Sequence, residues 1–270
     1  MSVGDRRARF RALHARQQLF VMPNPWDVGS ARLLSSLGFE ALATTSAGLA
    51  WTLGRLDTNV LRDELVAHVE AMAVATELPL NVDSERCFAD DLPGVADTVD
   101  LLAAAGAAGC SIEDYDPVTD RIDTLAVAAA RVGAAAEAAH RLSEPMVLTA
   151  RAENHLHGVA DLDDTIARLI AYRDAGADVV YAPGLASLDD IEAMVRAVGV
   201  PVNVLALRAG PSVAELASVG VRRVSTGGSL AKVAYGAAMV GARELLVSGT
   251  SNYTAQGVTQ ADLSGAFSSA

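Results

Sequence analysis

Residues 80–116 read LNVDSERCFADDLPGVADTVDLLAAAGAAGCSIEDYD, and this stretch decides the fold. An apolar run at Leu80–Asp83 is followed by polar residues, by a segment with helical periodicity at Asp97–Ala107, and by a second apolar run at Gly109–Glu113. Gly106 precedes the second run, where it can adopt the left-handed conformation that ends a helix. The stretch therefore predicts a strand–helix–strand unit.

The same pattern repeats along the chain and predicts eight strands. The predicted strands are Leu19–Asn24, Ala41–Ser46, Leu80–Asp83, Gly109–Glu113, Met146–Arg151, Asp178–Ala182, Val202–Leu205 and Arg223–Ser225. The predicted helices between them include Leu61–Leu78, Asp97–Ala107, Thr124–Leu142, Asp163–Ala175 and Leu188–Val198. Apolar strands that alternate with helices indicate a parallel sheet covered by helices. We predict an α/β fold, a (β/α)8 TIM-type barrel, with a doubly wound open sheet as the alternative.

The chain length of 270 residues suits one barrel domain of about 250 residues without a linker. We therefore predict a single domain over residues 1–270. Residues 5–18 are expected to form an extra N-terminal helix before the barrel. Residues 230–247 are expected to form the last helix, and residues 248–270 a C-terminal tail rich in Ser, Gly and Thr.

The charge balance limits the choice of partners. The net charge is −12, from 21 basic and 33 acidic residues, which argues against nucleic acid or an anionic membrane. An anionic substrate remains compatible, because a local Arg or a metal ion can reverse the field inside a cleft. Two cysteines, Cys87 and Cys110, are too few for a disulfide framework. The N-terminus is too charged for a secretory signal, and we expect a cytoplasmic protein.

Acidic residues gather where three successive predicted strands end. These strand ends carry Asp83 and Glu85, then Glu113, then Arg151 and Glu153. In a barrel, the carboxyl ends of the strands form the active-site face. Carboxylates packed there repel each other unless a cation lies among them. Oxygen ligands without a Cys or His cluster favour Mg²⁺ (or Mn²⁺). Acids that are only solvated, or that cap the next helix, are the alternative.

Four segments resemble the isocitrate lyase / phosphoenolpyruvate mutase superfamily, and the similarity extends from Phe20 to about Gly241. They are MPNPWDVGSARLLSSLGFEALATTSAGLAWTLGRLD, PLNVDSE, AGCSIEDYD and LTARAEN. The Asp-x-Glu, Ile-Glu-Asp and Ala-Arg-x-Glu elements are each weak alone, but their order and spacing are specific. The resemblance implies the barrel fold, a magnesium ion and an enolate-type intermediate.

The resemblance also implies roles for individual residues. Asp83 matches the acid that ligates Mg²⁺ most directly, while Glu85 and Glu113 match acids that hold its water shell. Asp57 matches an Asp near metal and substrate, and Arg151 matches the Arg that pairs with substrate oxygens. Thr45, Ser46 and Ala47 stand at the turn that binds the substrate carboxylate; Trp26 and Asn203 are expected at the same mouth.

The loop after the fourth strand departs from the lyases of this superfamily. They carry Lys-Lys-Cys-Gly there, whose Cys is the catalytic acid/base, and residues 114–122 contain neither Cys nor Lys. Tyr115, which follows the strand, is our candidate catalytic substitute, and Tyr181 could also donate a proton. His155 and His157 are expected to be exposed loop residues.

We predict a Mg²⁺-dependent carbon–carbon lyase or decarboxylase that acts on a small di- or tricarboxylate through an enolpyruvate-type intermediate. One alternative is a phosphonopyruvate or phosphoenolpyruvate mutase or hydrolase. Another is a non-catalytic barrel that only binds a carboxylate. A homo-oligomer, tetramer or dimer, is expected, because in the family the last helix packs on a neighbouring subunit and residues 230–247 are apolar enough to do so.

Overall fold

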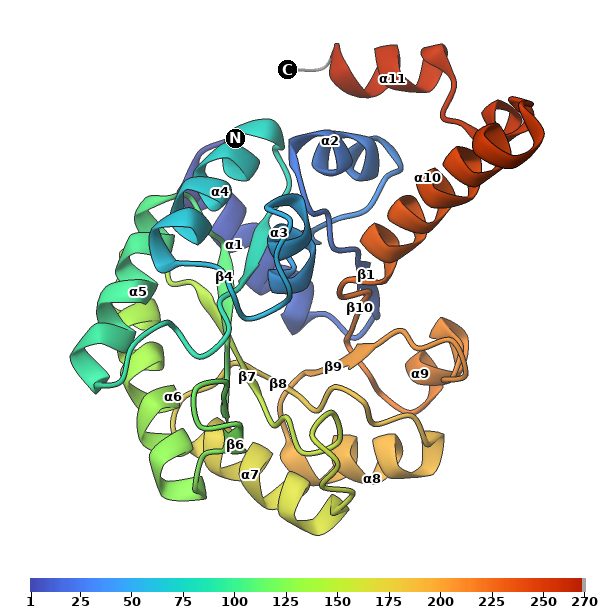
Figure 1. Ribbon diagram of the computed structural model, residues 1–270. Helices are drawn as coiled ribbons and strands as arrows, with labels where there is room; N and C mark the ends of the chain where they lie inside the picture. The colour runs from blue at the N-terminus through green and yellow to red at the C-terminus, as the bar shows by residue number, and fades with distance from the viewer. Residues whose placement is uncertain (269–270) are drawn as a thin grey trace.

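The computed structural model describes residues 1–268 and contains an eight-stranded parallel sheet that curls into a nearly closed barrel (Figure 1). The strand order is β1-β10-β9-β8-β7-β4-β3-β2. β1 and β2 meet at the ends of this order, where the Ala43 amide donates to the Pro23 carbonyl at 3.1 Å and the Asn24 side-chain amide donates to the Thr44 carbonyl at 2.7 Å. The predicted barrel is confirmed, and the open-sheet alternative is wrong.

Four strands, β3, β4, β9 and β10, have the predicted bounds, and the other four are shorter than the apolar runs that predicted them. The strands span Phe20–Met22 (β1), Leu42–Ala43 (β2), Leu80–Asp83 (β3), Gly109–Glu113 (β4), Val147–Arg151 (β7), Val179–Tyr181 (β8), Val202–Leu205 (β9) and Arg223–Ser225 (β10). Each neighbouring pair in the sheet is parallel, and the register places Glu113 opposite Arg151 and Arg151 opposite Tyr181. The strand-end residues are therefore brought to one rim.

Helices surround the barrel in chain order (Figure 1). They are Val28–Ser36 (α2), Ser46–Thr52 (α3), Arg62–Ala75 (α4), Leu92–Ala104 (α5), Leu125–His140 (α6), Leu162–Asp174 (α7), Leu188–Val198 (α8) and Val213–Ser218 (α9), whereas the last long helix, Ser229–Ser248 (α10), extends away from the barrel. Asp27 caps the start of α2, and its carboxylate accepts from the Ser30 amide at 2.7 Å.

The leading helix spans Val3–Ala15 (α1) and closes the amino-terminal end of the barrel. Its Phe10 and Leu13 belong to one buried apolar cluster with residues of β1, β2, β7 and β8. Gly109 makes this approach feasible, because a Cβ atom there would lie 2.8 Å from the Phe10 ring and 2.7 Å from a backbone oxygen of β7. A second cluster packs the outer face of the strands against the surrounding helices.

Three segments differ from the sequence-based expectation. The loop after β4 forms a two-stranded antiparallel hairpin, Tyr115–Asp116 (β5) and Arg121–Ile122 (β6). The tail contains a 3-10 helix, Asn252–Gln256 (η1), and a helix, Gln260–Phe267 (α11), which lies beside α2; residues 269–270 lie outside the described residues. Within residues 1–268, no helix has the length and apolarity needed to cross a membrane.

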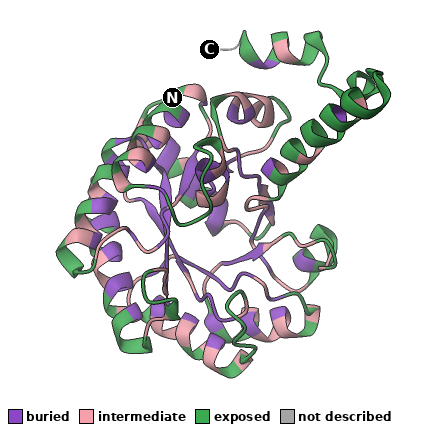
Figure 2. Cartoon of the chain, in the orientation of Figure 1, coloured by how far each residue is buried: buried purple, intermediate pink, exposed green. Residues whose placement is uncertain are grey.

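Helix α10 projects away from the barrel, and most of its surface is exposed (Figure 2). Ala231 and Gly241 are its buried residues. Its exposed side chains include large apolar ones such as Met239, Val240 and Leu246.

Candidate active site

A cavity of about 170 Å³ opens at the carboxyl ends of the strands. Its wall combines strand-end residues such as Thr45, Asp83, Arg151 and Ser225 with residues deeper in the barrel such as Arg223. This volume is well below the 300–1,000 Å³ that is usual for drug-sized ligands, so the cavity suits a small acid.

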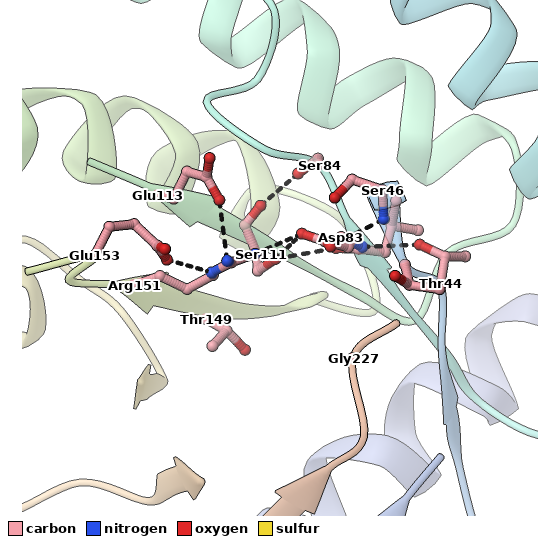
Figure 3. A network of polar contacts seen from close by, with 12 residues as sticks. Thr44, Ser46, Asp83, Ser84, Ser111, Glu113, Thr149, Arg151, Glu153 and Gly227 are labelled. Atoms are coloured by element: carbon pink, nitrogen blue, oxygen red, sulfur yellow. Dashed lines mark hydrogen bonds and ion pairs between the residues drawn. The ribbon is translucent and has the colours of Figure 1, made fainter. Parts of the chain in front are cut away.

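Arg151 is the centre of the site, because its guanidinium contacts three carboxylates (Figure 3). Nη1 lies 2.7 Å from Asp83 Oδ1, Nη2 lies 3.2 Å from Glu113 Oε2, and Nε lies 2.8 Å from Glu153 Oε1. Although burial opposes its charge, these carboxylates raise the pKa of Arg151 well above the usual value. The Arg is thus a fixed cation that donates from Nε and Nη1 and forms an ion pair with Glu113 through Nη2.

Asp83 is oriented by the loop after β2 and by β4. Its Oδ2 accepts from the Ser46 amide at 3.1 Å, and its own amide donates to Thr44 Oγ1 at 2.9 Å. The Ser111 hydroxyl lies 3.5 Å from Oδ1. With Arg151 on Oδ1 as well, the carboxylate has a defined rotamer at the centre of the rim.

The other acids of the rim have raised pKa values. Burial, reinforced by the charges of Asp83 and Asp57, raises the pKa of Glu85 to about 8. Burial also raises the pKa of Glu113. The charge of Arg151 opposes this increase, and the charges of the neighbouring carboxylates add to it. At the cavity mouth, partial loss of hydration and the charge of Asp83 raise the pKa of Asp57. The rim therefore holds more carboxyl groups than Arg151 alone can keep ionised.

This excess of carboxylates fits a divalent cation. Glu85 Oε1 is buried without a hydrogen-bond partner among the described residues, and the Glu85 backbone is left-handed, with φ of 48°. Oxygen donors of this kind suit Mg²⁺, which is commonly held by one or two carboxylates and several waters. Within residues 1–268, no three His, Cys, Asp or Glu side chains surround one point as a complete ligand set. Arg151 lies between Asp83 and Glu113, and Glu85 lines a separate groove on the hairpin side.

The residues predicted to bind substrate divide into two groups. Thr45, Ser46, Ala47 and Asn203 line the cavity, as does Asp57. Thr45 also caps α3, its hydroxyl accepting from the Gly48 amide at 3.3 Å.

Trp26 and Tyr115 are not part of the cavity wall. Trp26 lies against the start of α3, where a Cβ on Gly48 would be 2.7 Å from the Trp26 Cβ. Tyr115 stacks on His157 with ring centroids 3.6 Å apart, and its hydroxyl donates to Asp120 at 2.7 Å. The roles proposed for Trp26 and Tyr115 remain predictions, and the geometry gives them no direct contact with the cavity.

Several cavity residues were not singled out by the sequence reasoning. They are Asn81, Ser111 and Arg223, each on a strand and facing the barrel interior. A signal was present, because side chains two residues apart on a strand share a face. Asn81 precedes Asp83 by two positions, Ser111 precedes Glu113, and Arg223 precedes Ser225.

The base of the hairpin is anchored by buried charge. Asp114 accepts from the Tyr172 hydroxyl at 2.5 Å, from Arg168 Nη1 at 3.1 Å and from the Glu153 amide at 2.9 Å. The Asp123 amide donates to the Asp114 carbonyl at 2.7 Å and closes the loop. Asp114 thereby joins the hairpin to α7 and to the residue that holds Arg151.

The two cysteines, His155 and Lys232 do not line this cavity. Cys87 and Cys110 are buried and free, and burial raises the pKa of Cys87 to about 11. His155 lies 3.3 Å from the Thr165 hydroxyl, outside the cavity wall. Lys232, at the start of α10, lies over the Trp51 ring, 5.4 Å from its centroid.

These features define a (β/α)8-barrel protein with an acidic strand-end site built around one arginine. The family model described as phosphoenolpyruvate phosphomutase matches residues 10–246. The chain therefore belongs to the phosphoenolpyruvate phosphomutase family, and the predicted superfamily is confirmed.

Curated relatives and solved structures agree with this assignment. An uncharacterized protein of Mycobacterium tuberculosis is 34% identical over 220 residues, which cover 81% of each chain. An oxaloacetate decarboxylase of Paraburkholderia xenovorans is 32% identical over 72% of this chain and 67% of its own. A Burkholderia cenocepacia structure provisionally described as a lyase/mutase is 49% identical, with a TM-score of 0.93 over 97% and 95% of the two chains. An oxaloacetate acetylhydrolase in complex with the product oxalate is 26% identical, with a TM-score of 0.87 over 97% and 94%.

Proposed function

We propose that the protein is a Mg²⁺-dependent carbon–carbon lyase or decarboxylase for a small 2-oxo or 2-hydroxy dicarboxylate, with oxaloacetate as the first substrate to test. The observation that carries the proposal is Arg151, fixed beside Asp83 and Glu113 at the rim of a small cavity. Relatives named oxaloacetate decarboxylase and oxaloacetate acetylhydrolase support this class of substrate.

The chain's own residues supply binding and charge. Asp83 would hold Mg²⁺ directly, and Glu85 and Glu113 would hold molecules of its water shell; the metal would supply a Lewis acid for the oxygen that becomes negative. Arg151 places a second positive charge beside the same oxygen or the adjacent carboxylate. Its planar guanidinium can donate two parallel hydrogen bonds to such an anion. The Arg needs no reorientation, because three carboxylates already hold it.

The absence of the loop Cys is compatible with decarboxylation. When a β-carboxylate leaves as CO₂, the electron pair of the broken C–C bond forms the enolate, and no base is needed to start the reaction. The enolate carbon then takes one proton from water or from an acid in the cavity. Tyr181 lines the cavity, and its ring lies 5.5 Å from the Arg151 guanidinium carbon, so its hydroxyl is a candidate for this acid.

The test is turnover of oxaloacetate followed by NMR, with Mg²⁺ and with EDTA, against an enzyme-free Mg²⁺ blank. We expect pyruvate to form faster than in the blank, and EDTA to abolish the difference. Asp83→Ala should lose Mg²⁺ binding by calorimetry while it keeps the fold, whereas Glu70→Gln, at an exposed site on α4, should behave as the parent. Unchanged Mg²⁺ affinity in Asp83→Ala would contradict the metal assignment.

Phosphorus–carbon chemistry is the second candidate, because the matching family model is that of a phosphomutase. A Burkholderia cenocepacia structure provisionally described as a phosphonomutase is 36% identical, with a TM-score of 0.83 over 92% and 100% of the chains. Phosphorus NMR of phosphonopyruvate with the protein and Mg²⁺ distinguishes the two candidates. A new phosphate ester or free phosphate would favour this chemistry, and an unchanged spectrum would exclude this substrate.

A further inference from the structure

Four arginines are deeply buried, and one of them differs from the rest. Arg6 and Arg7 donate to backbone carbonyl oxygens near the carboxyl ends of α4 and α5, where the helix dipole is negative. Arg131 donates to three backbone carbonyl oxygens of the loop after β3. Arg223, with 2% of its surface exposed, has neither a backbone carbonyl nor a carboxylate partner among the described residues.

The three partners of Arg223 are neutral side chains. Nε donates to Asn203 Oδ1 at 2.8 Å, Nη2 donates to Thr149 Oγ1 at 2.9 Å, and Nη1 lies 3.2 Å from His14 Nε2. His14 Nδ1 lies 2.8 Å from the Phe10 carbonyl, so Nδ1 carries the proton and Nε2 accepts from the Arg. Burial lowers the pKa of His14 to about 3, which keeps the ring neutral.

Arg223 is therefore a buried cation without an anion. Burial lowers its pKa to about 9, so the guanidinium is still charged at neutral pH. A buried charge that lacks a counter-ion is strongly unfavourable. A guanidinium has five N–H donors, and the three contacts leave two of them free to bind a further group.

The position of Arg223 indicates which group that is. Arg223 lines the same cavity as Arg151. Its partner Thr149 precedes Arg151 by two positions on β7. Thr149 therefore lies one side-chain layer deeper in the barrel than Arg151, about 6.6 Å along the strand. Asn81 and Ser111 line the same lower level and make it polar. A four- or five-carbon dicarboxylate can span from one level to the other.

We propose that Arg223 forms a second carboxylate subsite at the floor of the cavity, which binds the end of the substrate remote from Asp83 and Arg151. This subsite rests on the proposed function, since it assumes that the other end of the ligand binds at the rim. It selects dicarboxylates over 2-oxo monocarboxylates. The ion pair with Arg223 stabilises the bound substrate, in which the remote carboxylate carries a full charge. It does not stabilise the transition state of decarboxylation, in which that charge moves into the enolate. Arg223 therefore strengthens binding and does not accelerate decarboxylation.

A matched pair of stable ligands tests the subsite. 2-Oxoglutarate and 2-oxopentanoate share the 2-oxo acid end, and only the first has a remote carboxylate. Calorimetry on the full chain with Mg²⁺ should give at least tenfold tighter binding of 2-oxoglutarate. Arg223→Gln should reduce that affinity at least tenfold, to the level of 2-oxopentanoate, while binding of 2-oxopentanoate stays the same. Arg223→Lys should keep part of the preference.

Oxalate separates this proposal from the proposed function, because it is too short to reach the floor. Oxalate binding that is unchanged in Arg223→Gln is expected. Absence of oxalate binding in the parent protein would contradict the function at the rim. If the parent protein binds oxalate but binds 2-oxoglutarate and 2-oxopentanoate with equal affinity, the floor subsite is overturned. This comparison needs only the parent protein, so it holds even if Arg223→Gln does not fold. An equal loss for both ligands in a folded Arg223→Gln would also overturn it and leave Arg223 only an anchor for α1.

The kinetic readout with oxaloacetate is a change in KM rather than in kcat. Because Arg223 stabilises the carboxylate of the ground state, Arg223→Gln should raise KM at least tenfold without lowering kcat. A fall in kcat at unchanged KM would contradict the subsite.

Discussion

Replacing Glu85 with glutamine should stabilise the metal-free protein at alkaline pH. In the folded chain the pKa of Glu85 is about 8, mainly because its carboxyl is buried, against 4.5 for an ordinary glutamate. Between these pH values the folded state keeps a proton that the unfolded state has lost. The free energy of unfolding therefore falls as the pH rises from 4.5 towards 8, and levels off above that. The difference corresponds to about 5 kcal/mol at full extent.

Glutamine has the same shape and no charge, so Glu85→Gln removes this penalty. Urea unfolding in EDTA should give similar stability for the parent and variant at pH 5. At pH 8.5 the variant should be more stable by several kcal/mol, which corresponds to a rise in Tm of about 10 °C for a chain of this size. Glu70→Gln is the control, because Glu70 is exposed on α4. A difference between parent and Glu85→Gln that does not change between pH 5 and 8.5 would refute the reasoning.

Magnesium should reverse this difference. A cation beside Glu85 favours the carboxylate, so Mg²⁺ binding releases a proton and becomes tighter as the pH rises. Mg²⁺ should raise the Tm of the parent more at pH 8.5 than at pH 6, and this pH dependence should be weaker in Glu85→Gln. The same shift in both proteins would place Glu85 outside the influence of the metal.

Arg151, Tyr172 and the exposed face of α10 each have a contact or surface that a single substitution can test. Arg151→Gln should lower kcat/KM by roughly 30- to 1,000-fold, equivalent to 2–4 kcal/mol, in a steady-state assay with saturating Mg²⁺, and full activity would remove Arg151 from the mechanism. Tyr172→Phe removes the hydroxyl that donates to the buried Asp114 carboxylate and should cost about 1.5–3 kcal/mol in denaturant unfolding; no loss would mean that Arg168 alone satisfies Asp114. Light scattering should give the parent a mass that is a multiple of 27.9 kDa, and Leu246→Asp on the exposed face of α10 should reduce it to the monomer; a monomeric parent would remove the expected oligomer.

The barrel could be predicted because short, mainly apolar runs alternate with segments of helical periodicity. Helix α8 was predicted with its observed bounds, since Ser187 caps its start and Gly199 ends it in a left-handed conformation. The hairpin after β4 could not be predicted. It depends on the contact of Asp114 with Tyr172 on α7, a pairing of residues 58 positions apart. Helix α3 is short, and its seven residues give too little periodicity to detect.

Part of the site could also be predicted, because it depends on the order of the strands. Strand ends in a barrel converge, so Asp83, Glu113 and Arg151 could be grouped from their order alone. Rotamers could not be predicted, because they depend on partners across the barrel. Arg151 lies between Asp83 and Glu113, and the left-handed backbone of Glu85 turns that residue towards the hairpin. Arg223 was missed because the prediction considered only the last residues of each strand.

The charges of the two cavity arginines are unbalanced in opposite directions. Around Arg151, three carboxylates contact one cation, and a divalent metal ion would offset the excess negative charge. Around Arg223, the contacts within the described chain are all neutral, and an anion would offset the excess positive charge. A metal-bound dicarboxylate satisfies both requirements at once, because its chelating end accompanies the metal and its free end reaches the floor. The proposed substrate class and the proposed subsite are therefore two consequences of the same charge distribution, and the matched ligand pair tests the part that the metal alone cannot explain.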